Sequence, residues 1–285
     1  MPLAAARALI TAAAVEHRTL AAFDAITLEH VQAVVEGAES VGAPVIIQVS
    51  ESVVQYDDGR LLPLARAAAE AARSAAVPVA LHLDKVRRTA LLAQAAHCGF
   101  SSIMYDAARL PYGRNVAVTR DAAQWAHEQN LWIEAEAVPA TAGVAACDPG
   151  AARTFAAATG VDALTVPLGA HPDRGLLARL RAALDLPLVL RDTPGGSDHD
   201  LGDLGLAAAE GIAKVTVGAG LDRAMTAAVR ASLALDDSTD PRVYLREGRR
   251  AMTAAVARIV RALNTPTAPG TSADAPVNTP LPARA

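Results

Sequence analysis

The chain has 285 residues, a net charge of −4 at neutral pH and a pI near 6.0, with 52% hydrophobic but only 3% aromatic residues. This length and composition allow one large domain whose core is built mainly from Ala, Leu, Val and Ile. The mild negative charge and the lack of a basic patch argue against nucleic-acid and membrane-surface partners. The two cysteines, Cys98 and Cys147, form neither a disulfide framework nor a zinc-knuckle spacing, which favours a cytoplasmic location.

Eight short apolar runs are the main structural signal along the chain. Before them, the first 20 residues are apolar but interrupted by Arg7 and His17, which predicts an amphipathic helix and not a signal peptide. Continuous apolar runs of this length are typical of parallel strands buried on both faces. The predicted strands are 20–24, 45–50, 79–84, 101–106, 131–137, 162–168, 186–192 and 212–218.

Helical patterns separate these runs and carry start and stop signals. Thr27 is a candidate N-cap for the first of them, and another begins at Asp148-Pro149 and stops at Gly160. Eight β-then-α units within about 230 residues predict an α/β fold, a (β/α)8 TIM barrel. A doubly wound open sheet is the alternative, but no GxGxxG follows the first strand.

Two further helices are predicted after the eighth strand, at about 220–234 and 240–263, and the second is amphipathic. Residues 1–263 are therefore predicted to form a single TIM-barrel domain with extra N-terminal and C-terminal helices. The tail 264–285 is rich in Pro, Thr and Ala and has almost no large apolar side chain to bury. We predict that it is disordered.

Ionisable and polar residues gather at the ends of the predicted strands, where a TIM barrel builds its active site. Glu134 and Glu136 are two residues apart and therefore share one face of their strand. Asp24 and Asp106 are interpreted as turn starters and not as ligand contacts. The set as a whole indicates chemistry, because acids and bases converge at one end of the barrel. Its members are Asp24, Ser50, Glu51, Asp84, Lys85, Asp106, Glu134, Glu136, His171, Arg191, Asp192, Thr216 and Gly218.

These stretches resemble the class II, metal-dependent ketose-bisphosphate aldolases, a family that includes the fructose- and tagatose-bisphosphate aldolases. The resemblance is collinear over about residues 2–262. It implies a barrel whose zinc, held by three histidines, acts as a Lewis acid on dihydroxyacetone phosphate. It also implies assembly as a homodimer or homotetramer. The matching stretches are AAFDAITLEHVQAVVEGAES, VIIQVSES, VALHLD, SSIMYDAARLPYGRNVAVTR, IEAEA, DPGAARTFAAATGVDALTV, LPLVLR and AKVTVGAGLDRAM.

Carried over position by position, the resemblance is incomplete at the metal site. Asp84 matches the aspartate that handles the proton of the aldol hydroxyl, and His171 matches the second zinc histidine after a one-residue deletion. Lys85 and Arg191 stand where the first and third zinc histidines belong. The family's EAE stretch near the metal is kept, with Glu136 as its second acid.

Two other parts of the family site are also altered. The loop VPATAGVAAC has no acid, although the family uses a mobile-loop glutamate to move the proton at carbon. The family's group for binding substrate and phosphate is replaced by Thr216, Gly218, Ala219 and Gly220. Zinc in a catalytic site needs at least three protein ligands, and an arginine cannot deprotonate to become one. We therefore predict that no zinc cofactor is bound in the family mode; if any metal binds, its ligands are His171 and Glu136.

Three functions are compatible with these residues. The first is a degenerate family member that binds a small phosphorylated sugar or another small anion through Lys85 and Arg191. The second is an active lyase in which Lys85 forms a Schiff base and Asp84 acts as acid–base, although an ion pair of Lys85 with a nearby carboxylate is the simpler interpretation. The third is an ordinary zinc aldolase whose ligands are rearranged among His82, His171 and Glu136. In each, the expected substrate contacts are Ser50, Glu134, Arg191, Gly195, Lys214 and Thr216.

Overall fold

The fold is taken from a computed structural model, which describes residues 3–16, 18–137, 147–167, 173–191 and 209–264. The predictions for His171, Gly195 and the loop 138–146 lie outside these residues. So does the predicted disordered tail, apart from Asn264. That residue is the last of the C-terminal helix, and its side-chain amide donates to the carbonyl of Val260 at 2.8 Å.

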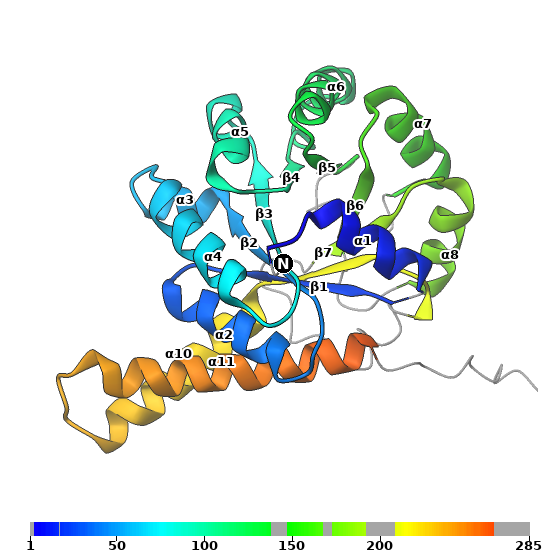
Figure 1. Cartoon of the computed structure of the whole chain (residues 1–285). Helices are drawn as coiled ribbons and strands as arrows, with labels where there is room; N and C mark the ends of the chain where they lie inside the picture. The colour runs from blue at the N-terminus through cyan, green and yellow to red at the C-terminus, as the bar shows by residue number, and fades with distance from the viewer. Residues whose placement is uncertain (1–2, 17, 138–146, 168–172, 192–208, 265–285) are drawn as a thin grey trace, which may run out of the picture.

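Eight parallel strands form a closed barrel in which each strand pairs with its neighbours in sequence and β1 pairs with β8 (Figure 1). The predicted (β/α)8 barrel is therefore confirmed. Five of the predicted strands are shorter in the structure by one or two residues at each end, whereas β3 continues two residues further, to Val86. The strands are β1 (Leu20–Asp24), β2 (Val45–Ser50), β3 (Val79–Val86), β4 (Ser102–Tyr105), β5 (Trp132–Ala135), β6 (Ala163–Pro167), β7 (Leu188–Arg191) and β8 (Lys214–Val217).

Helices surround the barrel and bury its outward-facing side chains (Figure 1). They are α2 (Leu28–Glu39), α3 (Glu51–Tyr56), α4 (Leu62–Ser74), α5 (Thr89–Ala95) with the short 3-10 helix η1 (Ala96–Cys98), α6 (Tyr112–Glu128), α7 (Pro149–Thr159) and α8 (Arg174–Ala183). The predicted cap of α7 is confirmed, because Asp148 accepts from the Ala151 amide at 2.8 Å and Gly160 has φ +71°. Thr27 precedes α2 as predicted, but its hydroxyl donates to Glu29 and makes no capping bond.

The N-terminal helix α1 (Ala6–Val15) covers the N-terminal end of the barrel (Figure 1). Its buried side chains Ala6, Ile10 and Ala13 pack against the innermost layer of barrel side chains. The backbone of Ala6 also donates to the hydroxyl of Ser101, just before β4, at 2.9 Å. This end is therefore filled, which leaves the opposite end, where the strands finish, to form a site.

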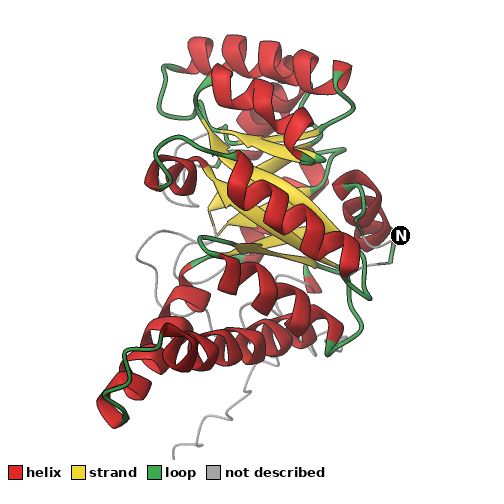
Figure 2. Ribbon diagram, turned by 60° about the vertical axis from the view of Figure 1, so that its left-hand side comes forward, coloured by secondary structure: helices red, strands yellow, loops and turns green. Residues whose placement is uncertain are grey.

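The last two helices, α10 (Ala219–Leu235) and α11 (Pro241–Asn264), form an antiparallel hairpin (Figure 1). The second half of α11 packs against α2, and the turn between the two helices projects beyond the barrel (Figure 2). Close packing explains a glycine in α2: a Cβ on Gly37 would lie 2.6 Å from the side chain of Val256. Among the described residues, no helix combines the length and apolar character needed to cross a membrane.

Candidate functional site

The middle of the barrel interior is polar, in contrast to the bulky aliphatic layers that usually fill a TIM barrel. The ammonium of Lys214, on β8, donates to both carboxylate oxygens of Glu134, on β5, at 2.8 and 2.7 Å, and both side chains are fully buried. Lys214 Nζ also lies 3.5 Å from Nε2 of His82, whose Nδ1 lies 2.8 Å from the hydroxyl of Ser102. Lys214 and Glu134 therefore link opposite sides of the barrel below the strand ends.

Asp84 and Lys85 lie above this layer, near the end of β3. The strand alternates regularly up to Asp84, so the side chains of His82 and Asp84 point into the barrel, and the pairing with β4 then shifts between Leu83 and Val86. Lys85, within this irregularity, has φ +53°, which is rare for a residue with a side chain. Its ammonium lies 3.7 Å from Asp84 Oδ2, and its side chain is 25% exposed.

The carboxylate of Asp84 is surrounded by positive charge and by His82. Its Oδ1 lies 3.8 Å from Nε2 of His82. Burial on its own raises the pKa of Asp84, but His82, the Lys85 ammonium and the Arg191 guanidinium outweigh that effect and hold the pKa well below its usual value. The influence of Arg191 also indicates that its guanidinium is near Asp84, although the two residues come from β7 and β3. Asp84 is therefore ionised at neutral pH.

Arg191, the last residue of β7, forms a buried ion pair with Glu136, which directly follows β5. Arg191 is thus paired with an acid that follows a different strand. Arg191 Nε is buried and has no hydrogen-bond partner among the described residues, and neither has the buried hydroxyl of Thr165 on β6. Two buried donors on neighbouring strands are thus free to bind a ligand or water.

Asp24, interpreted from sequence as a turn starter, belongs to the same end of the barrel. The side-chain amide of Gln48 on β2 donates a hydrogen bond to Oδ1 of Asp24, and the side-chain Oε1 of Gln48 accepts one from the Thr216 hydroxyl on β8 at 3.4 Å. Burial and the nearby Asp84 carboxylate raise the pKa of Asp24 to about 6, against the opposing effects of Lys85 and Gln48. The signal for Gln48 was present in the sequence, as the one polar residue inside the apolar run 45–49.

A Cβ on Gly218 would lie 2.5 Å from Asp24 Oδ2, so the absence of a side chain there makes room for this carboxylate. Ser50, expected to contact substrate, caps α3: its hydroxyl accepts from the Val53 amide at 3.4 Å and lies 2.7 Å from the Ser52 hydroxyl. Asp106 lies outside the barrel interior and pairs with Arg87. The strand ends therefore bring together Asp24, Asp84, Lys85, Glu136, Arg191 and Thr216, with Glu134 and Lys214 below them.

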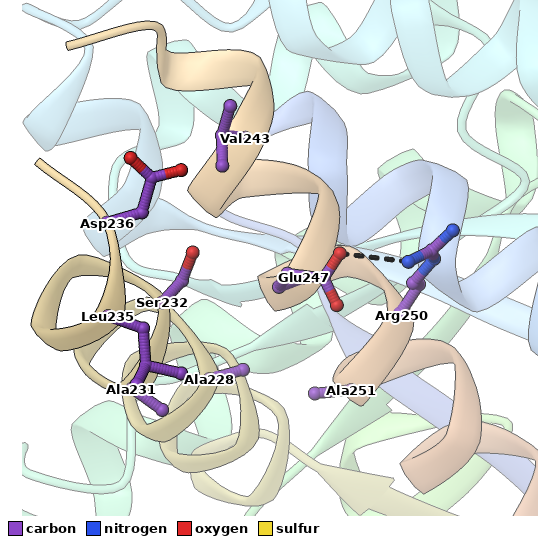
Figure 3. Close-up of a pocket in the computed structure, with 9 residues that line it drawn as sticks. All are labelled: Ala228, Ala231, Ser232, Leu235, Asp236, Val243, Glu247, Arg250 and Ala251. Atoms are coloured by element: carbon purple, nitrogen blue, oxygen red, sulfur yellow. Dashed lines mark hydrogen bonds and ion pairs between the residues drawn. The ribbon is translucent and has the colours of Figure 1, made fainter. Parts of the chain in front are cut away.

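A second charged cluster lies beside β3, where the buried Glu51 accepts from Arg88 and from the backbone of Arg87. Cys98 and Cys147 are buried free thiols. A shallow hollow of about 600 Å³ lies between α10 and α11, where Glu247 and Arg250 form a surface ion pair beside Leu235 (Figure 3). It lies on the projecting hairpin, and its lining is mostly apolar, with Asp236, Glu247 and Arg250 as the charged residues.

Comparisons with known proteins agree with the fold. The family "Fructose-bisphosphate aldolase class-II" matches residues 4–267. A Bacillus subtilis (strain 168) protein described as "Probable fructose-bisphosphate aldolase" is 31% identical over 272 residues, which cover 88% of this chain and 94% of that protein.

Two solved structures share the barrel. The YdjI aldolase from Escherichia coli K12 superposes with a TM-score of 0.80 at 27% identity, covering 92% of this chain and 97% of that one. The fructose-bisphosphate aldolase from Campylobacter jejuni has a TM-score of 0.76 at 20% identity, covering 90% of this chain and 93% of that one, and shows the fold alone.

Proposed function

The chain belongs to the class II fructose-bisphosphate aldolase family, and on that premise we propose that it is a member without the family's zinc site and without zinc-dependent aldolase activity. The observation that supports this is the buried ion pair between Arg191 and Glu136. From the sequence resemblance, Arg191 stands in place of a zinc histidine and Glu136 belongs to the acidic stretch beside the metal. In the family's site the positive charge at this position is a coordinated zinc ion. In this chain the guanidinium of Arg191 supplies the positive charge.

The donor atoms of the described residues do not fit zinc. Both oxygens of Glu134 are occupied by Lys214, Glu136 is bound by Arg191, and Asp84 is paired with Lys85. Within the described ranges, no group of three or more His, Cys, Asp or Glu side chains is arranged to hold a metal. A divalent ion among these residues would also meet the positive charges of Lys85 and Arg191, which do not readily deprotonate.

We propose that the strand ends bind a small phosphorylated sugar or another small anion. Two features support a polar ligand here: Arg191 Nε and the Thr165 hydroxyl are buried donors without partners among the described residues, and Lys85 is accessible at 25% exposure. Asp84, ionised and next to Lys85, is positioned to accept a hydrogen bond from a ligand hydroxyl through its Oδ2, which accepts no hydrogen bond from the described residues. Substrate contacts by Ser50, Thr216 and Gly195 stay predictions, as does a cytoplasmic location.

Zinc content and aldol cleavage test the proposal together. Protein purified without chelators should contain far less than one zinc per chain by mass spectrometry and should not cleave fructose or tagatose bisphosphate at rates above background. Stoichiometric zinc together with ordinary aldolase turnover would overturn the proposal.

A pair of variants makes the metal test more specific. Lys85→His with Arg191→His restores two family ligands and should raise zinc content above that of the wild type, because two imidazoles replace two cations. Lys85→Gln with Arg191→Gln removes the same charges but adds no imidazole, and should leave zinc content low. Equal zinc content in the two variants would contradict the role given to these positions, provided circular dichroism shows both to be folded.

A metal-free lyase that uses Lys85 is the second candidate, favoured by the exposure and the unusual φ of this residue. The ionised Asp84 argues against this function. Its carboxylate stabilises the protonated form of Lys85, whereas Schiff-base formation requires the neutral amine. Borohydride reduction in the presence of dihydroxyacetone phosphate separates the two functions. The chain has only two lysines, Lys85 and the buried Lys214, so a reduced adduct can be assigned by peptide mass. We expect none at Lys85; an adduct there would favour the lyase.

A further inference from the structure

A second pocket lies on the outside of the barrel and is lined by residues of α5, α6 and the end of β4. Its volume is about 240 Å³. The helix α5 has seven residues and the neighbouring part of the pocket wall, α6, has 17. Leu92, Val118 and Ala122 form its apolar lining. The volume is below the range of about 300–1,000 Å³ typical of pockets for drug-sized ligands, so an occupant must be small.

The lining also includes two aromatic side chains. Tyr105, the last residue of β4, is mostly buried, and Trp125 on α6 is partly buried. Aromatics make up only 3% of the whole chain, so two of them around one small pocket is a marked local enrichment. The π faces of tyrosine and tryptophan attract cations, and tryptophan does so most strongly.

One carboxylate lines the pocket, that of Asp121 on α6. In the described part of the chain, Asp121 forms no hydrogen bond and no ion pair, and its charge acts on the phenol of Tyr105. The Thr89 hydroxyl, at the start of α5, adds a polar contact. Among the lining residues Asp121 alone is charged at neutral pH, so the pocket carries a single negative charge. Nearby, Arg114 and Glu51 also act on Tyr105, with opposite signs, but neither lines the pocket.

We propose that this pocket binds a small organic amine, with its protonated amino group at Asp121 and its aromatic or branched apolar body against Tyr105 and Trp125. An unpaired carboxylate supplies the counter-ion, two aromatic rings supply cation–π attraction, and the aliphatic lining accepts the apolar body. The pocket lies on the outside of the barrel and shares no lining residue with the charged cluster of Asp24, Asp84, Lys85, Glu136 and Arg191, so the proposal does not depend on the function proposed for that cluster.

Benzylamine is a suitable probe because it fits the volume and combines one ammonium with one ring. Titration into the full-length protein, followed by isothermal calorimetry, should give saturable binding with a dissociation constant of about 1 mM. Benzyl alcohol has nearly the same shape without the charge, and should bind about fivefold more weakly or worse. Benzoate, with the charge reversed, should not bind.

Tryptophan fluorescence gives an independent readout, since the chain has only two tryptophans and Trp132 is buried inside the barrel. Benzylamine should change the emission of the wild type, and Trp125→Leu should remove both that change and most of the calorimetric affinity.

The charge is tested by Asp121→Asn, which should weaken benzylamine binding about fivefold. Its matched control is Glu128→Gln, which removes a carboxylate from the same helix but outside the pocket, where Glu128 only accepts a bond from Gln124. That variant should bind as the wild type does. Equal affinity for benzylamine and benzyl alcohol, equal losses in the two variants, or no saturable binding up to about 20 mM would each overturn the proposal.

Discussion

Lys214 and Glu134 form the most deeply buried ion pair among the described residues, with each side chain about 1% exposed. Such a pair is held together mainly because either charge alone is costly inside a protein. Replacing Lys214 with Met leaves the Glu134 carboxylate buried beside His82 without its main donor. The intact ion pair therefore adds little net stability, but loss of one partner leaves a buried, unpaired charge that is costly.

We expect Lys214→Met to lower the free energy of unfolding by about 3–5 kcal/mol, because Glu134 becomes an unpaired buried charge. Lys214→Met combined with Glu134→Leu should recover most of that loss, since neither charge is then present. Urea titrations followed by circular dichroism measure both effects. A loss below about 1 kcal/mol in the single variant would contradict a dry ion pair at this position.

Asp24 contributes a pH dependence of the opposite sign to that of Asp84. Its pKa rises from 3.8 in the unfolded chain to about 6 in the folded one, so the folded state binds this proton more tightly. The contribution of Asp24 to stability is therefore greatest below the unfolded pKa, decreases as the pH rises between these values, and is constant above about 6. The lowered pKa of Asp84 instead makes stability fall as the pH drops into the acid range.

Asp24→Asn isolates this effect, because asparagine keeps an oxygen for the Gln48 donor but does not titrate in this range. Since Asp24 is only partly buried, we expect the variant to gain roughly 1–2 kcal/mol relative to the wild type between pH 4 and pH 7. Parallel urea titrations of both proteins at pH 4 and pH 7 give the difference in unfolding free energy between variant and wild type at each pH. The histidines contribute equally to both proteins, so their effect cancels in this difference. A difference that stays constant with pH would show that Asp24 keeps an ordinary pKa.

At the scale of elements, the packing of α2 against α11 depends on one glycine. A Cβ on Gly37 would lie 2.6 Å from Val256 and 2.9 Å from the backbone oxygen of Thr253, and the backbone contact cannot be relieved by turning a side chain. The two helices therefore approach more closely than any residue with a side chain allows. This contact joins the C-terminal hairpin to the barrel.

Gly37→Ala should accordingly reduce stability by about 1–3 kcal/mol, although alanine is the better helix former. Gly113→Ala is the matched control, because Gly113 is also helical and a Cβ there would meet nothing within 4 Å. The control should be as stable as the wild type or slightly more stable. Thermal unfolding of the three proteins compares them directly, and equal effects of the two substitutions would contradict the close contact.

At the scale of the whole molecule, the hairpin of α10 and α11 carries two exposed leucines near the end of α10. Leu233 and Leu235 of α10 are 49% and 89% exposed, and Leu235 lines the hollow between α10 and α11 (Figure 3). Apolar side chains exposed together on a projecting element are typical of interaction surfaces. We propose that this surface contributes to a homodimer or homotetramer.

Light scattering coupled to size-exclusion chromatography should therefore give a mass of two or four chains. Leu233→Ser with Leu235→Ser should shift the protein towards the monomer, because each change removes apolar area from the contact. Tyr56→Ser, which replaces a 78% exposed aromatic residue outside the hairpin, should leave the mass unchanged. A wild type that is monomeric at all concentrations would contradict the assembly.

The sequence by itself determined the barrel and the end at which its polar residues gather. Eight apolar runs alternate with helical patterns, and in parallel strands the residues after each run necessarily lie at one end. The sequence therefore sufficed to select four site residues, because identifying each one requires only its position relative to the end of its own strand. They are Asp84, Lys85, Glu136 and Arg191.

Only the tertiary structure decided which of these charges meet. Arg191 pairs with Glu136 and Lys214 with Glu134, and in each pair the two residues come from different, non-adjacent strands. Asp24 joins the site through Gln48 on the neighbouring strand. Such pairings depend on barrel closure and on the register between strands far apart in the chain, and these follow from packing of the whole barrel. A local sequence pattern predicts which way a side chain points, but it does not predict which residue from another strand it will contact.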